Sequence, residues 1–91
     1  MLLITTYTVK PYITQEETAA LMAVFAEEGA APGEIAHYVN ADGGGGVVIS
    51  EVDDIRASYR NNLNYSQWLT FESRVVVPVN DAVPHILDAL S

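Results

Sequence analysis

The chemistry open to this 91-residue chain depends first on its two histidines, because it contains no cysteine. His37 lies in a run where apolar and polar residues alternate, and an imidazole there could contact a ligand. The alternative is that His37 is a partly buried strand residue that hydrogen-bonds to a neighbour. His85 lies near the C-terminus, and we interpret it as a surface residue. Neither His-x-His nor His-x-x-x-His spacing occurs, so the sequence predicts no metal site and no cofactor.

A second group of candidate residues alternates along the last β-type run of the sequence. Trp68, Thr70, Glu72 and Arg74 would share one face of a strand, and Glu51 ends another such run. If this face lines a cavity, a carboxylate in apolar surroundings acquires a raised pKa that suits proton transfer. The alternative is structural: Glu72 and Arg74 form ion pairs across a dimer interface or with each other's strands, and Trp68 anchors an interface. The complete candidate ligand-binding face comprises Tyr7, His37, Glu51, Trp68, Thr70, Glu72 and Arg74.

Composition and motifs exclude several other functions. Without cysteine there is no disulfide, no thiol nucleophile and no thiolate-bound metal. A net charge of −8 repels phosphate backbones and anionic lipids, so we expect no nucleic-acid partner and no membrane partner. No serine lies in a G-x-S-x-G motif, and the glycines that follow Asp42 precede a strand pattern, which indicates a hairpin tip rather than a phosphate-binding loop.

The start of the chain bears on its location. Met1 to Val9 is apolar, but this stretch is too short to span a membrane. It also lacks the basic residues that precede the apolar region of a secretion signal. We therefore interpret it as a first strand and expect a cytoplasmic protein.

The elements that must position these residues can be predicted from local patterns. Thr14 and Glu17 have capping-box spacing, and Gly29 suits a helix end, so a helix is expected between them. Asp53 is expected to cap a second helix, and Asn80 a short final helix with Pro84 near its first turn. Alternation of side chains predicts four strands. The predicted order is strand 2–9, helix 14–28, strands 35–40 and 47–52, helix 53–66, strand 68–77 and a helix from 80.

This order is typical of one α+β domain over residues 1–91. It matches the ferredoxin-like βαββαβ arrangement, in which two helices cover one face of an antiparallel four-stranded sheet. The other face is left bare. We predict that a second copy of the chain covers it and that a pocket forms between the two sheets.

Three segments of the sequence also resemble a known family. They are the strand opening Ile4-Thr-Thr-Tyr-Thr8, the glycine hairpin and cap Asp42 to Asp54, and the closing strand Trp68 to Val79. On these segments the chain is similar to the DUF3303 domain family, which is grouped with the dimeric α/β-barrel proteins. The resemblance implies a dimeric barrel of the ferredoxin-like superfamily. That family has no established activity, so no catalytic residues carry over, and the wider barrel group includes cofactor-free monooxygenases, isomerases and haem enzymes.

Two functional hypotheses follow. In the first, a homodimeric barrel binds a small apolar or aromatic molecule, and the sequence leaves open whether it also transforms that molecule without a cofactor. In the second, the exposed sheet face and the edge strand 35–40 make the chain a protein-protein interaction or assembly module without catalytic activity.

Overall fold

Local capping residues determine where the helices begin in the computed structural model, which describes all residues from Met1 to Ser91. Thr14 caps α1 (Gln15–Glu28): its hydroxyl accepts from the Glu17 amide at 3.0 Å, and the Glu17 carboxylate accepts in return from the Thr14 amide at 3.4 Å. Lys10 fixes the same carboxylate from the preceding loop, with its Nζ atom 2.5 Å away. The predicted capping box is confirmed.

The other two helices differ from their predicted starts. Asp54, not Asp53, caps α2 (Ile55–Leu63), and its carboxylate accepts from the Arg56 amide at 2.9 Å. Pro78, not Asn80, precedes α3 (Val79–Ala89), where no side chain caps the helix. A fixed φ of −54° lets proline occupy this position. Pro84 therefore lies in the interior of α3 rather than near its first turn, and it leaves one backbone carbonyl without its helical partner.

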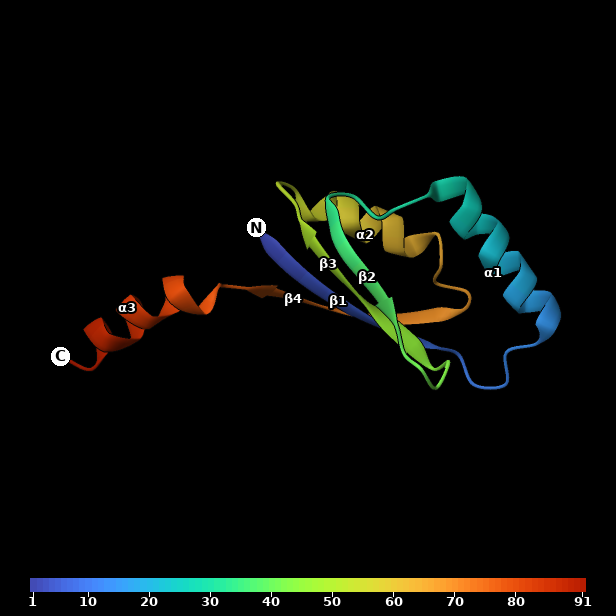
Figure 1. The fold of residues 1–91 in the computed structure, drawn as a ribbon. Helices are drawn as coiled ribbons and strands as arrows, with labels where there is room; N and C mark the ends of the chain where they lie inside the picture. The colour runs from blue at the N-terminus through green and yellow to red at the C-terminus, as the bar shows by residue number, and fades with distance from the viewer.

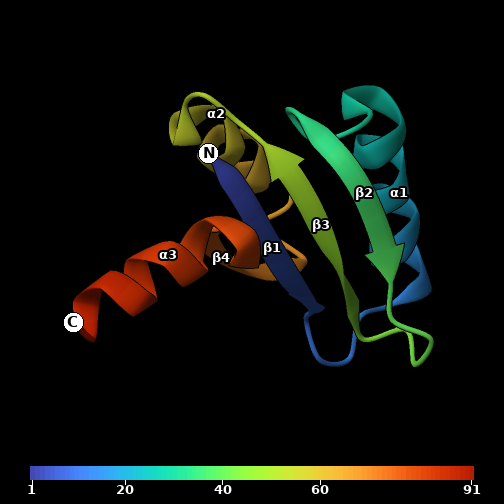
Figure 2. The same ribbon diagram turned by 60° about the vertical axis from the view of Figure 1, so that its left-hand side comes forward.

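Four antiparallel strands form one sheet in the order β2-β3-β1-β4, which is the ferredoxin-like α+β architecture (Figure 1). The strands are β1 (Leu2–Val9), β2 (Glu34–Val39), β3 (Gly45–Glu51) and β4 (Leu69–Val76). α1 and α2 lie behind the sheet in Figure 2, so they cover one of its faces. We call this the helix face and the opposite one the open face. The predicted fold class is confirmed.

The third helix departs from the body of the domain. α3 continues away from the end of β4 and stands apart from the rest of the chain (Figure 1), which gives the molecule extents of 57 × 26 × 17 Å. No residue of α3 is buried. None of the helices is long and apolar enough to cross a membrane.

The core is small for a chain of this length. Only 9 of the 91 residues are buried, and the apolar ones are Leu3, Val52, Tyr65 and Trp68. Along β1 the buried side chains are Leu3 and Thr5, which identifies the odd-numbered residues as those on the helix face. The even-numbered residues of β1 consequently lie on the open face.

Candidate functional site

A cavity of about 210 Å³ lies between the helix face of the sheet and the two helices α1 and α2. Its lining is mostly apolar: Leu21, Met22 and Phe25 come from α1, and Leu69 and Phe71 from β4. These three α1 residues have the helical spacing that places side chains on a common face. The cavity is partly open to solvent, because the side chains of Met22 and Phe25 are themselves 55% and 39% exposed.

The polar end of the cavity is a pair of side chains from different strands. The hydroxyl of Tyr7 on β1 lies 2.7 Å from Nε2 of His37 on β2. Their rings meet edge to face with centroids 5.6 Å apart, and Phe25 meets the other side of the histidine ring with centroids 6.1 Å apart. Both rings are therefore fixed by aromatic contacts as well as by the hydrogen bond.

A glycine between these two strands makes the contact possible. Gly46 on β3 is the direct cross-strand partner of Tyr7. A Cβ atom built at Gly46 would lie 2.4 Å from the Tyr7 hydroxyl oxygen and 2.5 Å from the Tyr38 carbonyl oxygen. The tyrosine ring thus crosses β3 over a residue without a side chain and reaches β2 beyond it. Gly45 and Gly46 are buried strand residues, so the interpretation of all four glycines as a hairpin tip holds only for the first two.

Glu34 completes this cluster because of an irregularity in β2. Residues three apart on a regular strand face opposite sides, yet Glu34 and His37 both line the cavity. The pairing of β2 with β3 shifts register between Glu34 and Ala36, a β-bulge that turns Glu34 to the helix face. Its carboxylate oxygen lies 3.7 Å from His37 Nδ1, which is ion-pair distance but longer than a hydrogen bond.

The electrostatics of the cluster favour a neutral tyrosine. Burial raises the pKa of Tyr7, and the negative charge of Glu34 raises it further. The Tyr7 hydroxyl consequently keeps its proton and can donate it to His37 Nε2. In that arrangement the proton of the neutral imidazole is on Nδ1, directed towards Glu34.

The remaining candidate residues lie elsewhere. Thr70, Glu72 and Arg74 are on the open face of β4, opposite even-numbered residues of β1, and Glu72 forms an ion pair with Arg74. Glu51 also lies on the open face, where its carboxylate accepts from the N-terminal amine of Met1 at 2.7 Å. No single pocket brings these four residues together with Tyr7 and His37.

Trp68 does not extend the alternating face as expected. It precedes β4 and is only 6% exposed. The amides of Trp68 and Leu69 both donate to the carbonyl of Tyr65, so Trp68 belongs to the turn that follows α2 rather than to the strand. The period-two argument fails at this residue because the backbone is not yet extended there.

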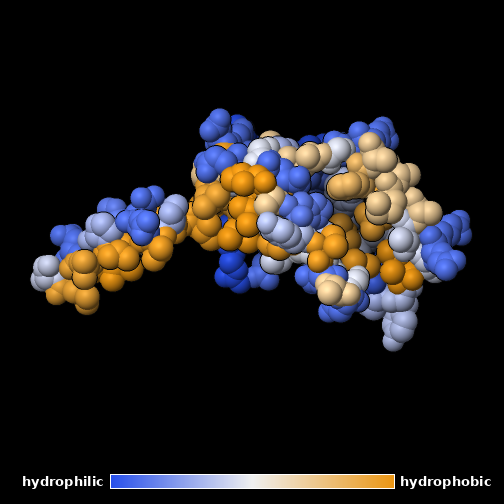
Figure 3. Space-filling model, viewed as in Figure 1, coloured by the Kyte–Doolittle hydropathy of each residue, from blue (hydrophilic) through white to orange (hydrophobic).

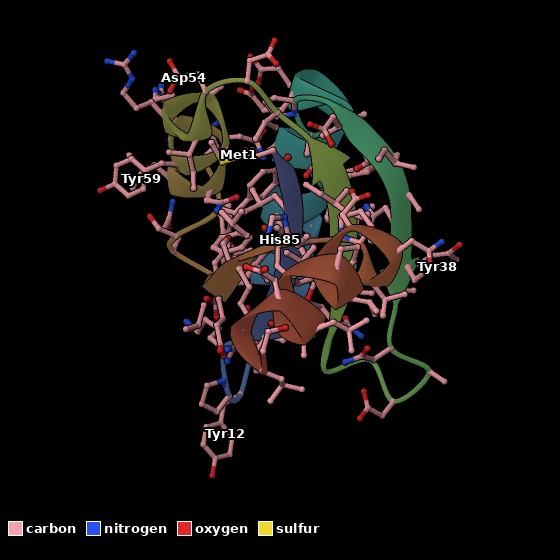
Figure 4. The ribbon with its side chains drawn as sticks, turned by 90° about the vertical axis from the view of Figure 1, so that its left-hand side faces the viewer. Met1, Tyr12, Tyr38, Asp54, Tyr59 and His85 are labelled. Atoms are coloured by element: carbon pink, nitrogen blue, oxygen red, sulfur yellow. The ribbon has the colours of Figure 1, made fainter.

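α2 presents an unexpected side to the cavity. Its apolar residues Ile55 and Tyr59 are 43% and 65% exposed, and Tyr59 points away from the molecule in Figure 4. Ser58, Asn61 and Asn62 line the cavity instead. The apolar residues of α2 therefore do not identify the side that faces the cavity. With Glu34 and Gly46, these three polar residues are the site residues that the sequence did not reveal.

Comparison with known proteins gives one family match. The model of a family described as "Domain of unknown function (DUF3303)" matches residues 1–90. No curated protein matches the chain.

Proposed function

The chain belongs to the DUF3303 family, whose function is unknown, and we propose from the geometry of the site that it binds a small apolar or aromatic molecule. The binding site is the cavity between the sheet and the helices α1 and α2, within one chain, rather than a pocket between two sheets. The observation that carries this proposal is an apolar cavity that ends in fixed polar groups.

The dimensions of the cavity support a ligand of this kind. An apolar cavity of roughly 150 Å³ is sufficient to bind benzene. The cavity here, at about 210 Å³, is larger and has space for one or two fused rings. Met22 and Phe25 lie at the exposed side of the cavity. The flexible side chain of methionine and the rigid ring of phenylalanine both commonly contact apolar ligands.

Naphthalene is a suitable first probe because it carries no polar group. At ten times its dissociation constant, a ligand that binds only the folded state stabilises a protein by about 1.4 kcal/mol, which corresponds to several degrees in Tm for a domain of this size. We expect that stabilisation for the wild type, measured by thermal unfolding, together with chemical-shift changes in NMR spectra.

Two leucine variants of α2 provide the matched comparison. Ser58 is buried and lines the cavity, so S58L fills the site, whereas Ala57 is exposed and A57L adds the same side chain outside it. We expect naphthalene to stabilise A57L and not S58L. No binding by the wild type, or equal binding by both variants, would contradict the proposal.

We also propose that the functional form is a homodimer. Few residues are buried in one chain, and the open face carries half-exposed Leu2, Ile4 and Ile49. α3 is amphipathic as well: Val83, Ile86 and Leu87 form part of an exposed apolar stripe on a helix that has no buried residue. Figure 3 shows this stripe continuing towards apolar surface on the sheet. A second copy would cover both surfaces in a symmetric arrangement.

The assembly-module hypothesis rests on the same exposed surfaces. It differs in requiring no cavity ligand. A dimer by light scattering together with no binding of apolar probes would favour this second function over the first.

A further inference from the structure

We propose that the Tyr7, His37 and Glu34 cluster makes the cavity selective for neutral ring compounds that donate a hydrogen bond, such as phenols, and excludes the corresponding carboxylates. This inference rests on the proposed binding function, because it names the chemical class that the same cavity accepts. Its basis is the direction of the hydrogen bonds in the cluster.

The Glu34 carboxylate determines which group donates in the hydrogen bond between Tyr7 and His37. The carboxylate can only accept, so the neutral imidazole of His37 is favoured with its proton on Nδ1, 3.7 Å away. His37 Nε2 is then an acceptor, and the Tyr7 hydroxyl at 2.7 Å must be the donor. Tyr7 and His37 therefore both orient their protons towards Glu34.

The free end of this chain of groups is the hydroxyl of Tyr7, a residue that lines the cavity. Its single proton is engaged with His37, but its lone pairs can still accept. A ligand that reaches this oxygen must supply a proton, as a phenol does. An ether or a ketone offers only lone pairs and finds no donor in the cluster, so it gains no hydrogen bond there.

Charge strengthens the selection. Glu34 is negative, the chain as a whole carries −8, and neither a lysine nor an arginine lines the cavity. A carboxylate ligand would meet repulsion in apolar surroundings without a cation to compensate. The same surroundings raise the pKa of Tyr7, consistent with a site that favours neutral hydroxyl groups over anionic ones.

Four probes of one ring system test this selection: naphthalene, 2-naphthol, 2-methoxynaphthalene and 2-naphthoate. Dissociation constants would be measured by titration calorimetry or NMR at about pH 8, where an ordinary imidazole is uncharged and an ordinary phenol is neutral. We expect 2-naphthol to bind about three- to tenfold more tightly than naphthalene, as one added hydrogen bond allows. The ether should bind no better than naphthalene, and 2-naphthoate should bind at least tenfold more weakly than 2-naphthol.

Variants assign the selection to its residues. Y7F removes only the hydroxyl, so it should abolish the difference between the dissociation constants of 2-naphthol and naphthalene. E34Q removes the charge, so it should increase the affinity for 2-naphthoate several-fold relative to the affinity for naphthalene. Glu34 acts here as a positioning residue. A change in the affinity for the anionic probe 2-naphthoate distinguishes this role from a general structural role, which would affect all four probes.

A glycine substitution tests the geometry independently. G46A introduces a Cβ atom into the position of the Tyr7 ring and leaves every polar group of the cluster in the sequence. G44A is the control in the same hairpin, because its Cβ atom would meet only the Asp42 side chain, at 3.1 Å. We expect G46A, and not G44A, to lose the preference for 2-naphthol.

The outcomes separate the two proposals. If none of the four probes binds, the proposed function itself is wrong. If naphthalene binds but 2-naphthol has no advantage over the ether, or if 2-naphthoate binds best, the cavity is a binding site and the selectivity inferred here is overturned.

Discussion

The position of one hydroxyl group, that of Tyr7, depends on three residues distant in the sequence. Gly46 leaves space for the ring, His37 accepts its hydrogen bond, and Glu34 determines the orientation of the imidazole. Tyr7 and His37 were candidates from sequence because their side chains can act in recognition. Glu34 and Gly46 were not, because a bulge and a cross-strand pairing leave no local signal in the sequence.

The raised pKa of Tyr7 leads to a prediction for alkaline conditions. The unfolded chain releases the tyrosine proton near the ordinary value of 10.0, whereas the folded chain retains it to higher pH. The stabilisation is therefore complete below pH 10 and is lost as the pH rises through the folded pKa. Burial and the negative charge of Glu28 also raise the pKa of Tyr65, so Tyr65 contributes in the same direction.

The measurement is urea unfolding between about pH 8 and 11, which spans the titration of an ordinary tyrosine. We expect Y7F to lose less stability than the wild type over this range. Y12F is the control, because Tyr12 is 97% exposed. Identical pH slopes for Y7F and the wild type would show that Tyr7 makes no such contribution.

At the scale of elements, helix starts depend on a few side chains near the cap. Thr14 and Glu17 satisfy free amides of α1 reciprocally, and Lys10 fixes Glu17. Lys10 and the Thr14 contacts lower the pKa of Glu17, chiefly through the hydrogen bond from Lys10. α1 contributes Leu21, Met22 and Phe25 to the cavity but has no fully buried residue, so the cap adds to the stability that its packing supplies.

We therefore predict that T14A destabilises the protein by about 1 kcal/mol, the usual effect of removing an N-cap side chain. The free energy of unfolding from urea denaturation measures this directly. T14S retains the hydroxyl and should recover most of the loss. A T14A variant as stable as the wild type would mean that α1 does not depend on its capping box.

At the scale of the whole molecule, apolar surface exceeds what one chain can cover. Val79, Val83, Ile86 and Leu87 on α3 and Leu90 directly after it are all more than 40% exposed. His85, also on α3, lies outside this stripe. Because burial of such surface is the main favourable term in association, the isolated chain resembles half of an assembly.

This surface gives a prediction for the assembly state. We expect the wild type to be dimeric in light scattering at micromolar concentration. I86D places a charge within the apolar stripe and should shift the mass towards the monomer, whereas H85D, on the neighbouring residue, should not. Since neither residue is buried in its own chain, both variants should keep the wild-type fold. A monomeric wild type, or equal masses for the two variants, would contradict the dimer proposal.

The sequence by itself determined the order of the elements, the fold class and the cap of α1. These features depend on side-chain alternation and on groups within one helical turn, and both are local. It also identified Tyr7 and His37 but grouped them with Glu51 and Glu72, which the structure places on the opposite face of the sheet. Strand pairing and the β2 bulge decided that separation, and the helix-sheet packing turned Ser58 rather than Tyr59 towards the cavity. These contacts join residues far apart in the chain, so only the tertiary structure could determine them.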